Sequence, residues 1–368
     1  MLNIIFFVFV GVIILQLAYY IGVLGKFAFA KPQPVTPKRI PVSVIVCAKN
    51  EAEKVKKFVP LLAEQNYPDF EIVLIDDASS DETLDVFEEF EKQYPNIRLV
   101  KVENNEAFWG NKKYALTLGI KAARKEYLLF TDADCYPAGK DWLMQMSSQF
   151  TMSKTIVLGY GAYEKVKGSF LNKIIRFDAM QMAAHYFSWA KAGRPYTAEG
   201  RNLAYKREEF FKVNGYIDHM SIRTGEDALF INQAATQKNT TISFAPESFT
   251  YCEAKQTFKA WRQKKRREQF VTAFFRPFDK LHIRLYHISQ LAFFILAIAL
   301  AVLQYNWMFL VPAIAVRYIG TWVVMGYSAT KLKEKDVAWW YPVMEIILIF
   351  TNINVFFTNI FSKPVHWK

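Results

Sequence analysis

Two carboxylates close an apolar run in the segment YLLFTDADCYPAG, residues 127–139. Asp132 and Asp134 are two positions apart, so at the end of an extended strand their side chains point the same way. Carboxylate oxygens that converge in this manner suit Mg²⁺ or Mn²⁺, hard cations that often share their coordination with a substrate phosphate. A solvated turn is the alternative for so short a motif. We interpret the pair as a candidate metal site with Asp134 and Asp132 as ligands.

A second acidic pair, Asp76 and Asp77, follows the apolar run EIVLID, and Lys112 begins a segment with helical periodicity. The two acids could shape a turn, or they could accept hydrogen bonds from the base or ribose of a nucleotide. A cation at a helix start opposes the helix dipole, at a cost of about 0.3–1 kcal/mol when exposed. Lys112 is better explained by a bound diphosphate, because phosphate groups bind at helix N-termini.

Two further groups of residues could act on the reacting atoms. Glu226 and Asp227 start a predicted helix in TGEDALF, where acids are stabilising, but a carboxylate there could also deprotonate an attacking hydroxyl. The basic segment KQTFKAWRQKKRREQF (255–270) could contact anionic lipid headgroups. One helical face of this segment, which could stabilise a leaving diphosphate, carries Gln263, Arg266 and Arg267.

The segment from residue 42 to residue 132 alternates short apolar runs with amphipathic stretches. This pattern predicts an α/β domain with a mostly parallel sheet covered by helices on both faces. Ligands of such sheets bind beyond the carboxyl ends of the strands, where both acidic pairs are expected. The expected strands are 42–47, 71–76, 97–102 and 127–132, and the expected helices are 50–65, 79–94 and 112–125.

Long apolar stretches lie near both ends of the chain. The stretch at residues 2–25 is long enough to span a bilayer; it is longer than the core of a signal peptide, and no basic residue precedes it. The C-terminal stretches predict a helical hairpin (288–329) and an apolar segment (337–361) that could span or be re-entrant. We therefore predict four parts: a transmembrane anchor (1–26), a linker (27–41), a catalytic domain (42–272) and a C-terminal membrane region (273–368).

Charge and cysteine content predict the location. Positively charged flanks stay in the cytosol, and the anchor is followed at once by Lys26, Lys31, Lys38 and Arg39. We expect a multi-pass protein of the cell (inner) membrane with a cytosolic catalytic domain. The three cysteines are odd in number and widely spaced, which indicates a reducing compartment and no disulfide. The net charge of +12 fits anionic lipid, and no base-reading motif supports nucleic acid as a partner.

In chain order, the segments VSVIVCAKNEAE, LIDDASSDET, GNKKYAL, FTDADC, GRNLAYKREEFFKVNGY, GEDALF and QKKRR resemble the membrane-anchored family 2 glycosyltransferases of the GT-A fold. The resemblance covers about residues 40–270. It implies a nucleotide-sugar donor, for which we expect a UDP-linked sugar, together with a divalent metal ion and inversion at the anomeric carbon. The membrane layout resembles that of members whose acceptor is a lipid or an envelope glycan.

The resemblance assigns roles to single positions. The nucleoside would be bordered by Ala48, Asn50, Glu51, Asp76 and Asp77. Asp227 would be the catalytic base, and the donor would be held by Lys112 at the phosphates, Asp132 at the nucleotide or sugar and Asp134 at the metal ion. Glu226 would lie on the side of the acceptor and the diphosphate. Gln263, Arg266 and Arg267 match the Q-x-x-R-W segment of the family and would lie on the same side. Arg266 would add positive charge as the diphosphate leaves. Because Arg267 replaces the tryptophan of polymerising members, processive synthesis is not expected.

Three other functions are compatible with parts of this pattern. A glycosidase also uses two carboxylates, but it needs no apparatus for metal and phosphate. A nucleotidyltransferase acting on a sugar phosphate would share the metal site and the sheet, but it leaves Glu226, Asp227 and the membrane hairpin unexplained. The third alternative is a non-catalytic membrane scaffold with a decayed site.

Overall fold

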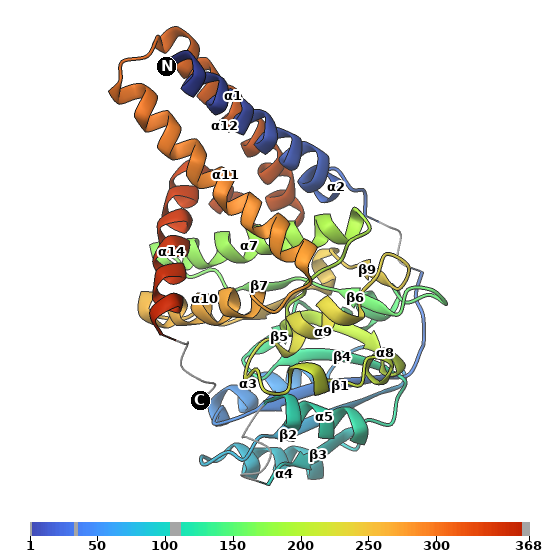
Figure 1. Cartoon of the computed structure of the whole chain (residues 1–368). Helices are drawn as coiled ribbons and strands as arrows, with labels where there is room; N and C mark the ends of the chain where they lie inside the picture. Colours follow the sequence, from blue (N-terminus) through green and yellow to red (C-terminus); the bar gives the residue numbers. More distant parts are fainter. Residues whose placement is uncertain (1, 33–35, 104–111, 363–368) are drawn as a thin grey trace.

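The computed structural model describes residues 2–32, 36–103 and 112–362. An α/β domain forms one part of the molecule, and long helices extend from it to one side (Figure 1). The central strands form where the sequence has runs of Val, Ile and Leu. These runs are buried on both faces, as the prediction of a helix-covered sheet requires.

The large sheet has seven strands in the order β3-β2-β1-β4-β8-β6-β9. The first four along the chain are mutually parallel, whereas β8 runs antiparallel to its neighbours β4 and β6. The prediction of an α/β fold with a mostly parallel sheet is therefore confirmed. The strands are β1 (Val42–Ala48), β2 (Phe70–Asp76), β3 (Ile97–Lys101), β4 (Tyr127–Asp132), β6 (Ile156–Leu158), β8 (Leu203–Lys206) and β9 (Thr240–Ile242).

Helices cover both faces of this sheet, because alternate residues of a strand point to opposite sides. Val44 and Val46 of β1 share a core with α3, α4 and α6, whereas Ile45 and Cys47 share a core with α5, α7 and α9. The two layers hold the strand ends in place from both sides. The helices are α3 (Ala52–Ala63), α4 (Thr83–Gln93), α5 (Lys112–Ala122), α6 (Trp142–Ser147), α7 (Phe170–Lys191), α8 (Arg207–Lys212) and α9 (Glu226–Ala234).

A second, three-stranded sheet follows the segment of the predicted metal site. Its order is β5-β10-β7, with β5 at Cys135–Pro137, β7 at Gly161–Tyr163 and β10 at Thr250–Cys252. The strand pairing places Cys135, Cys252 and Tyr163 side by side. The basic helix α10 (Phe258–Thr272) comes next, and the Thr257 side chain caps its N-terminus.

Among the described residues, four helices are long and apolar enough to cross a membrane. The first runs from α1 (Leu2–Tyr19) through a π-helical turn (Tyr20–Leu24) into α2 (Gly25–Ala28), and its end packs into the same core as the catalytic domain. The others are α11 (Pro277–Val302), α12 (Trp307–Lys331) and, after the short α13 (Lys335–Ala338), α14 (Tyr341–Phe361). In Figure 1, α1, α11 and α12 run together, whereas α14 turns away past α7 toward α10. The exact domain boundaries stay predictions.

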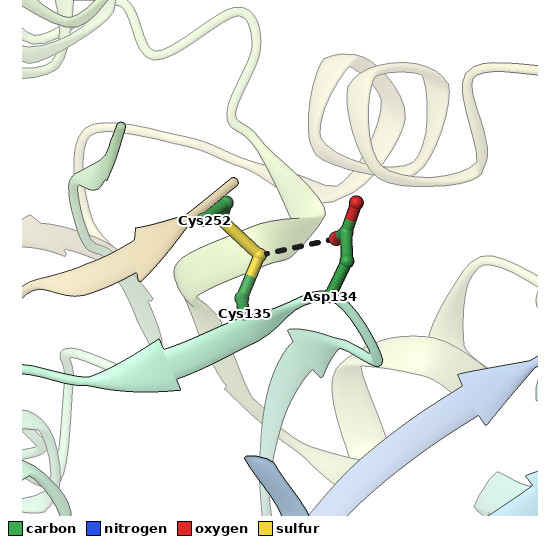
Figure 2. A group of neighbouring side chains, drawn as sticks. All are labelled: Asp134, Cys135 and Cys252. Carbon is green, nitrogen blue, oxygen red and sulfur yellow. Dashed lines mark hydrogen bonds between the residues drawn. A yellow bond between two sulfur atoms is a disulfide. The ribbon is translucent and has the colours of Figure 1, made fainter. Parts of the chain in front are cut away.

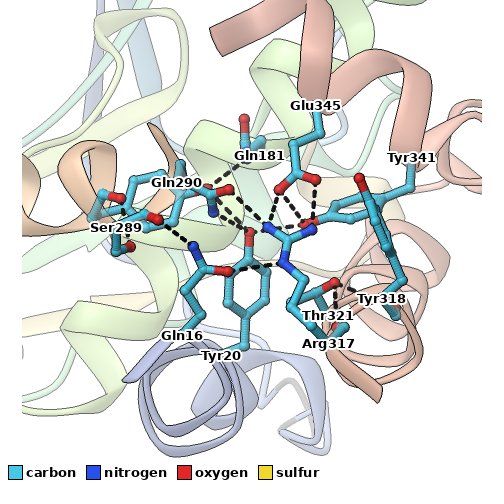
Figure 3. Close-up of polar contacts among 11 residues, drawn as sticks. Gln16, Tyr20, Gln181, Ser289, Gln290, Arg317, Tyr318, Thr321, Tyr341 and Glu345 are labelled. Atoms are coloured by element: carbon cyan, nitrogen blue, oxygen red, sulfur yellow. Dashed lines mark hydrogen bonds and ion pairs between the residues drawn. The ribbon is translucent and has the colours of Figure 1, made fainter. Parts of the chain in front are cut away.

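A buried polar network joins these four helices (Figure 3). The fully buried guanidinium of Arg317, on α12, pairs with both carboxylate oxygens of Glu345 on α14. Arg317 also donates hydrogen bonds of 2.8 Å to the side-chain carbonyls of Gln16 on α1 and Gln290 on α11. Buried charged groups are costly unless they find partners inside the protein. The hydrogen bonds and ion pair of the Arg317 guanidinium thus form only when the four helices hold this arrangement.

Replacing Arg317 with methionine should destabilise the protein by about 3–5 kcal/mol, because the Glu345 carboxylate is left buried without its partner. The double variant Arg317→Met/Glu345→Met should recover most of that loss, since it buries no charge. Thermal unfolding in detergent, followed by tryptophan fluorescence, measures both variants. Arg284→Met, at an exposed position of α11, is the control. A single variant that unfolds at the wild-type temperature would show that the network does not hold the helices together.

Candidate active site

The carboxyl ends of three neighbouring strands meet at one edge of the large sheet. In the strand register, Ala48 lies opposite Asp76, and Cys47 lies opposite Asp132. The residues predicted to border the donor therefore share an edge, as expected for ligand sites of parallel sheets.

Asp76 and Asp77 are each only 3% exposed and carry acceptor atoms that are not in use. Asp76 Oδ2 accepts a hydrogen bond from the Ser79 N–H at 3.3 Å. Within the described residues, Asp76 Oδ1 and Asp77 Oδ2 have no hydrogen-bond partner, and burial raises the pKa of Asp77. Buried acceptors without partners are uncommon in folded proteins. They fit a ligand that donates hydrogen bonds, such as a nucleotide base or a ribose hydroxyl.

The rim of this edge contains the other two predicted nucleoside contacts. Asn50 has a left-handed backbone (φ 56°), which asparagine tolerates better than most residues, and its Oδ1 accepts from the Ser80 N–H at 2.8 Å. Glu51 Oε2 lies 2.6 Å from Lys54 Nζ. Asn50 thus ties the loop after β1 to the loop after β2.

Lys112 bridges Asp132 at the end of β4 and Glu226 at the start of α9. Its Nζ lies 2.9 Å from Asp132 Oδ1 and 3.0 Å from Glu226 Oε1. Burial opposes its charge, but Asp132 and Glu226 outweigh that effect and raise the pKa of Lys112 well above its usual value. Lys112 therefore remains a cation at the start of α5, where its amine and the helix N-terminus can both face an anion.

The predicted metal ligands are two carboxylates whose negative charge is only partly balanced by neighbouring cations. Burial and the adjacent Asp132 charge raise the pKa of Asp134, whose Oδ2 lies 4.0 Å from Nζ of both Lys54 and Lys255. Burial also opposes ionisation of Asp132, but Lys112 lowers its pKa overall. Asp134 is partly open to solvent, with 22% of its side chain exposed. Two neighbouring carboxylates, one of them short of positive charge, fit a hard divalent cation such as Mg²⁺ or Mn²⁺.

The expectation of three reduced cysteines is wrong. Cys135 and Cys252, opposite each other on β5 and β10, form a disulfide (Figure 2). Cys47 is free and buried. The Cys135 Sγ lies 3.4 Å from Asp134 Oδ1. Disulfide sulfurs are not thiolates, so this group adds no soft ligand to the carboxylate site. The bond instead fixes the residue that follows Asp134 to the strand that leads into α10.

Asp227 lies at the N-terminus of α9, after Gly225, whose φ of 76° lets the chain turn sharply into the helix. Its Oδ2 accepts a 2.5 Å hydrogen bond from the Gly200 N–H, and its Oδ1 accepts a 2.6 Å bond from its neighbour, the Ala228 N–H. Burial and the Glu226 charge raise the pKa of Asp227 to about 7. Asp132, Lys112, Glu226 and Asp227 line a common cavity of about 30 Å³. The structure thus brings these four predicted residues together.

Of the three predicted residues of α10, Arg266 contacts the end of α14. Arg266 donates to Asn359 Oδ1 at 3.0 Å and to the Ser362 carbonyl at 2.7 Å, both at the end of α14. Gln263 is exposed and Arg267 half-buried, and no contact places either of them beside the carboxylates of the described residues. Their assignment to the diphosphate remains a prediction.

Sequence reasoning missed two cations near the site, Arg201 and Lys264. Arg201 follows Gly200 directly, stacks over Tyr163 at 4.4 Å and pairs with Glu199 at 2.6 Å. Lys264, on α10, lies 5.8 Å from the same ring. The charge of Arg201 also contributes to lowering the pKa of Asp132. Arg201 lies in the segment GRNLAYKREEFFKVNGY that carries the family resemblance, but no spacing rule would have selected it as a site residue.

Comparison with known proteins agrees with this arrangement. Residues 43–225 match the model of the family described as Glycosyl transferase family 2. A 194-residue segment is 28% identical to the dolichyl N-acetyl-alpha-D-glucosaminyl phosphate 3-beta-D-2,3-diacetamido-2,3-dideoxy-beta-D-glucuronosyltransferase of Methanococcus voltae, covering 50% of this chain and 55% of that protein. A 93-residue segment is 36% identical to the poly-beta-1,6-N-acetyl-D-glucosamine synthase of Staphylococcus epidermidis, covering 25% and 21%. The matched segments thus span little more than half of these relatives at most.

A solved structure extends the likeness over almost the whole chain. The mannosyltransferase PcManGT from Pyrobaculum calidifontis, determined in complex with GDP-Man and Mn²⁺, superposes with a TM-score of 0.58. The match covers 94% of this chain and 99% of that one at 20% identity, so it bears on the fold alone. Together with the family match, it shows that the α/β domain has the GT-A fold. The α/β domain of this chain, which contains the matched residues 43–225, therefore belongs to glycosyl transferase family 2.

Proposed function

We propose that this protein is a membrane-bound, inverting glycosyltransferase that uses a nucleotide-sugar donor, depends on Mg²⁺ or Mn²⁺, and glycosylates a lipid or an envelope glycan. The proposal rests on one observation above all. Asp227 is a half-buried carboxylate held by two backbone N–H groups and grouped with Lys112, Asp132 and Glu226 around one cavity.

Asp227 is suited to act as the general base. With a pKa of about 7, its carboxyl is partly ionised at neutral pH and still binds a proton well, which is the compromise that base catalysis needs. The N–H groups of Gly200 and Ala228 fix its orientation. As the acceptor hydroxyl attacks the anomeric carbon, Asp227 removes its proton, and the diphosphate leaves from the opposite side. A single displacement of this kind inverts the configuration and forms no covalent enzyme intermediate.

The donor end of the site is suited to hold and neutralise a diphosphate. Lys112 can exchange its contacts with Asp132 and Glu226 for phosphate oxygens, because an ammonium has three donors and a flexible stem. Asp76 and Asp77 hold the nucleoside by its donor groups. A divalent cation held by Asp134 and Asp132 would neutralise the charge that develops on the diphosphate. The predicted role of Arg266 requires that it leave Asn359 and Ser362.

Two relatives support the substrate classes. The name of the Methanococcus voltae enzyme describes transfer to a dolichyl-phosphate-linked sugar, and PcManGT was solved with GDP-Man and Mn²⁺. UDP-linked sugars, which we expect, and GDP-linked sugars both belong in a test.

The basic residues after the anchor support the cytosolic location that we propose for the domain. The Cys135–Cys252 disulfide points the other way, because disulfides are more typical of oxidising compartments than of the cytosol.

Incubating the purified protein in detergent with UDP- and GDP-sugars, a membrane lipid extract and Mn²⁺ or Mg²⁺ tests the proposal. We expect one donor to release its nucleoside diphosphate and to label a lipid or glycan product. A parallel incubation with UTP or GTP and a sugar 1-phosphate that releases pyrophosphate would instead indicate a nucleotidyltransferase. No release from any donor, with or without the extract, would favour the non-catalytic scaffold.

A further inference from the structure

We propose that α14 does not cross the membrane and instead lies on the leaflet next to the catalytic domain, with its aromatic outer face among the lipids of that leaflet. The proposal rests on the membrane location of the proposed function. Length and composition alone qualify α14 as a span. Its contacts decide between a span and a surface helix.

The second half of α14 is hydrogen-bonded to α10. Arg262 donates to Asn354 Oδ1 at 2.7 Å and to Thr358 Oγ1 at 2.9 Å. Arg266 donates to Asn359 Oδ1, and the Asn359 side chain returns a 3.0 Å bond to the Arg266 carbonyl. The end of α14 therefore lies wherever α10 lies.

Helix α10 belongs to the catalytic domain and not to the lipid. Lys265 pairs with Asp178 of α7 at 2.8 Å, and Val271 packs so closely on Gly225 that a Cβ there would lie 2.6 Å from it. The helix also carries six basic residues between Lys259 and Arg267, a composition that the hydrocarbon layer excludes. The end of α14 is thus on the side of the catalytic domain.

The chain already returns to that side before α14 begins. After α12, Glu334 and Asp336 both pair with Arg176 of α7, and the Asp336 contacts include one of 2.9 Å. Helix α7 is itself attached to the catalytic domain, since Tyr186 donates to the Gly159 carbonyl at 2.8 Å. A segment whose two ends are held on one side of a membrane crosses it an even number of times, and the single helix α14 can cross it only zero times.

The outer face of α14 fits a lipid surface. Phe350, Phe357 and Phe361 are 69%, 54% and 85% exposed. Together with Phe258 and Arg262 of α10, they line an open groove of about 800 Å³ between the two helices. Exposed aromatic rings beside a basic helix are typical of segments that lie in the headgroup layer of anionic leaflets. Three spans then remain, and residue 362 faces the same compartment as the active site.

Labelling of single cysteines in proteoliposomes tests this placement without measuring activity, so its failure is separable from failure of the proposed function. A membrane-impermeant maleimide is added before and after detergent to three variants: Lys121→Cys in the catalytic domain, Gln304→Cys between α11 and α12, and Ser362→Cys after α14. We expect Ser362→Cys to be protected to the same fraction as Lys121→Cys, and Gln304→Cys to give the complementary fraction. Wild-type protein, with Cys47 buried and the other cysteines bonded, is the blank.

Labelling of Ser362→Cys that follows Gln304→Cys would overturn the proposal. A nitroxide at Phe357→Cys tests the lipid contact: collisions with oxygen should exceed those with a water-soluble nickel chelate. The exposed Lys259→Cys on α10 should show the reverse. A spin label at position 357 that is more accessible to the nickel chelate would show that this face does not enter the leaflet.

Discussion

Replacing Asp227 with asparagine is expected to lower sugar transfer by about 10²–10⁴-fold, the usual contribution of a general base. The amide cannot take up the proton of the acceptor hydroxyl, although it is nearly the same size as the carboxylate. Donor binding should persist, because the role that we propose for Asp227 is a contact with the acceptor hydroxyl and not with the nucleotide. Initial rates of nucleoside diphosphate release and binding of the nucleoside diphosphate measure the two effects separately.

The pH profile distinguishes loss of a base from loss of structure. Wild-type transfer should fall as the pH drops below about 7, because protonated Asp227 cannot accept a proton. The residual rate of Asp227→Asn should not show this step. Asp218→Asn, an exposed carboxylate just upstream, is the control and should match the wild type. Unchanged transfer by Asp227→Asn would remove the proposed mechanism.

Replacing Asp134 with asparagine should weaken Mn²⁺ binding by at least about 10–100-fold, the loss that even outer-shell partners of metal sites cause. The amide keeps a neutral oxygen but removes the charge that a divalent cation requires, so transfer should fall in parallel. Calorimetry with MnCl₂ and metal titration of the transfer rate measure both. Asp141→Asn, an exposed acid a few residues later, should bind Mn²⁺ like the wild type. Equal Mn²⁺ affinity in the two variants would mean that Asp134 is not a ligand.

The sheet and the donor edge could be predicted because they follow from local patterns. The apolar runs that end in Ala48, Asp76 and Asp132 became β1, β2 and β4 almost residue for residue. Parallel pairing then sets their carboxyl ends at one edge, whatever the rest of the fold does.

Contacts between distant segments could not be predicted in this way. Cys135 and Cys252 are separated by 117 residues, and only the pairing of β5 with β10 brings them together. Helical spacing puts Gln263, Arg266 and Arg267 on one side of α10, but it does not predict which element packs against that side. In the structure, Arg266 contacts α14. Arg317 and Glu345 read as isolated charges in apolar runs until the helix packing pairs them.

The membrane anchor and the catalytic domain share one hydrophobic core. Phe27, near the end of the anchor, packs against Phe187 of α7 and against Phe244, with ring centres 5.1 and 5.4 Å apart, and Ser188 donates to the Leu24 carbonyl. The domain is therefore held against the anchor helix by side-chain packing and does not move freely on the linker. The same packing fixes the distance between Asp227 and the bilayer in which the anchor is proposed to lie. An acceptor anchored in the same bilayer must carry its hydroxyl at that distance from it. For the lipid-linked acceptor that we propose, transfer should therefore depend on the distance between its lipid anchor and its reacting hydroxyl.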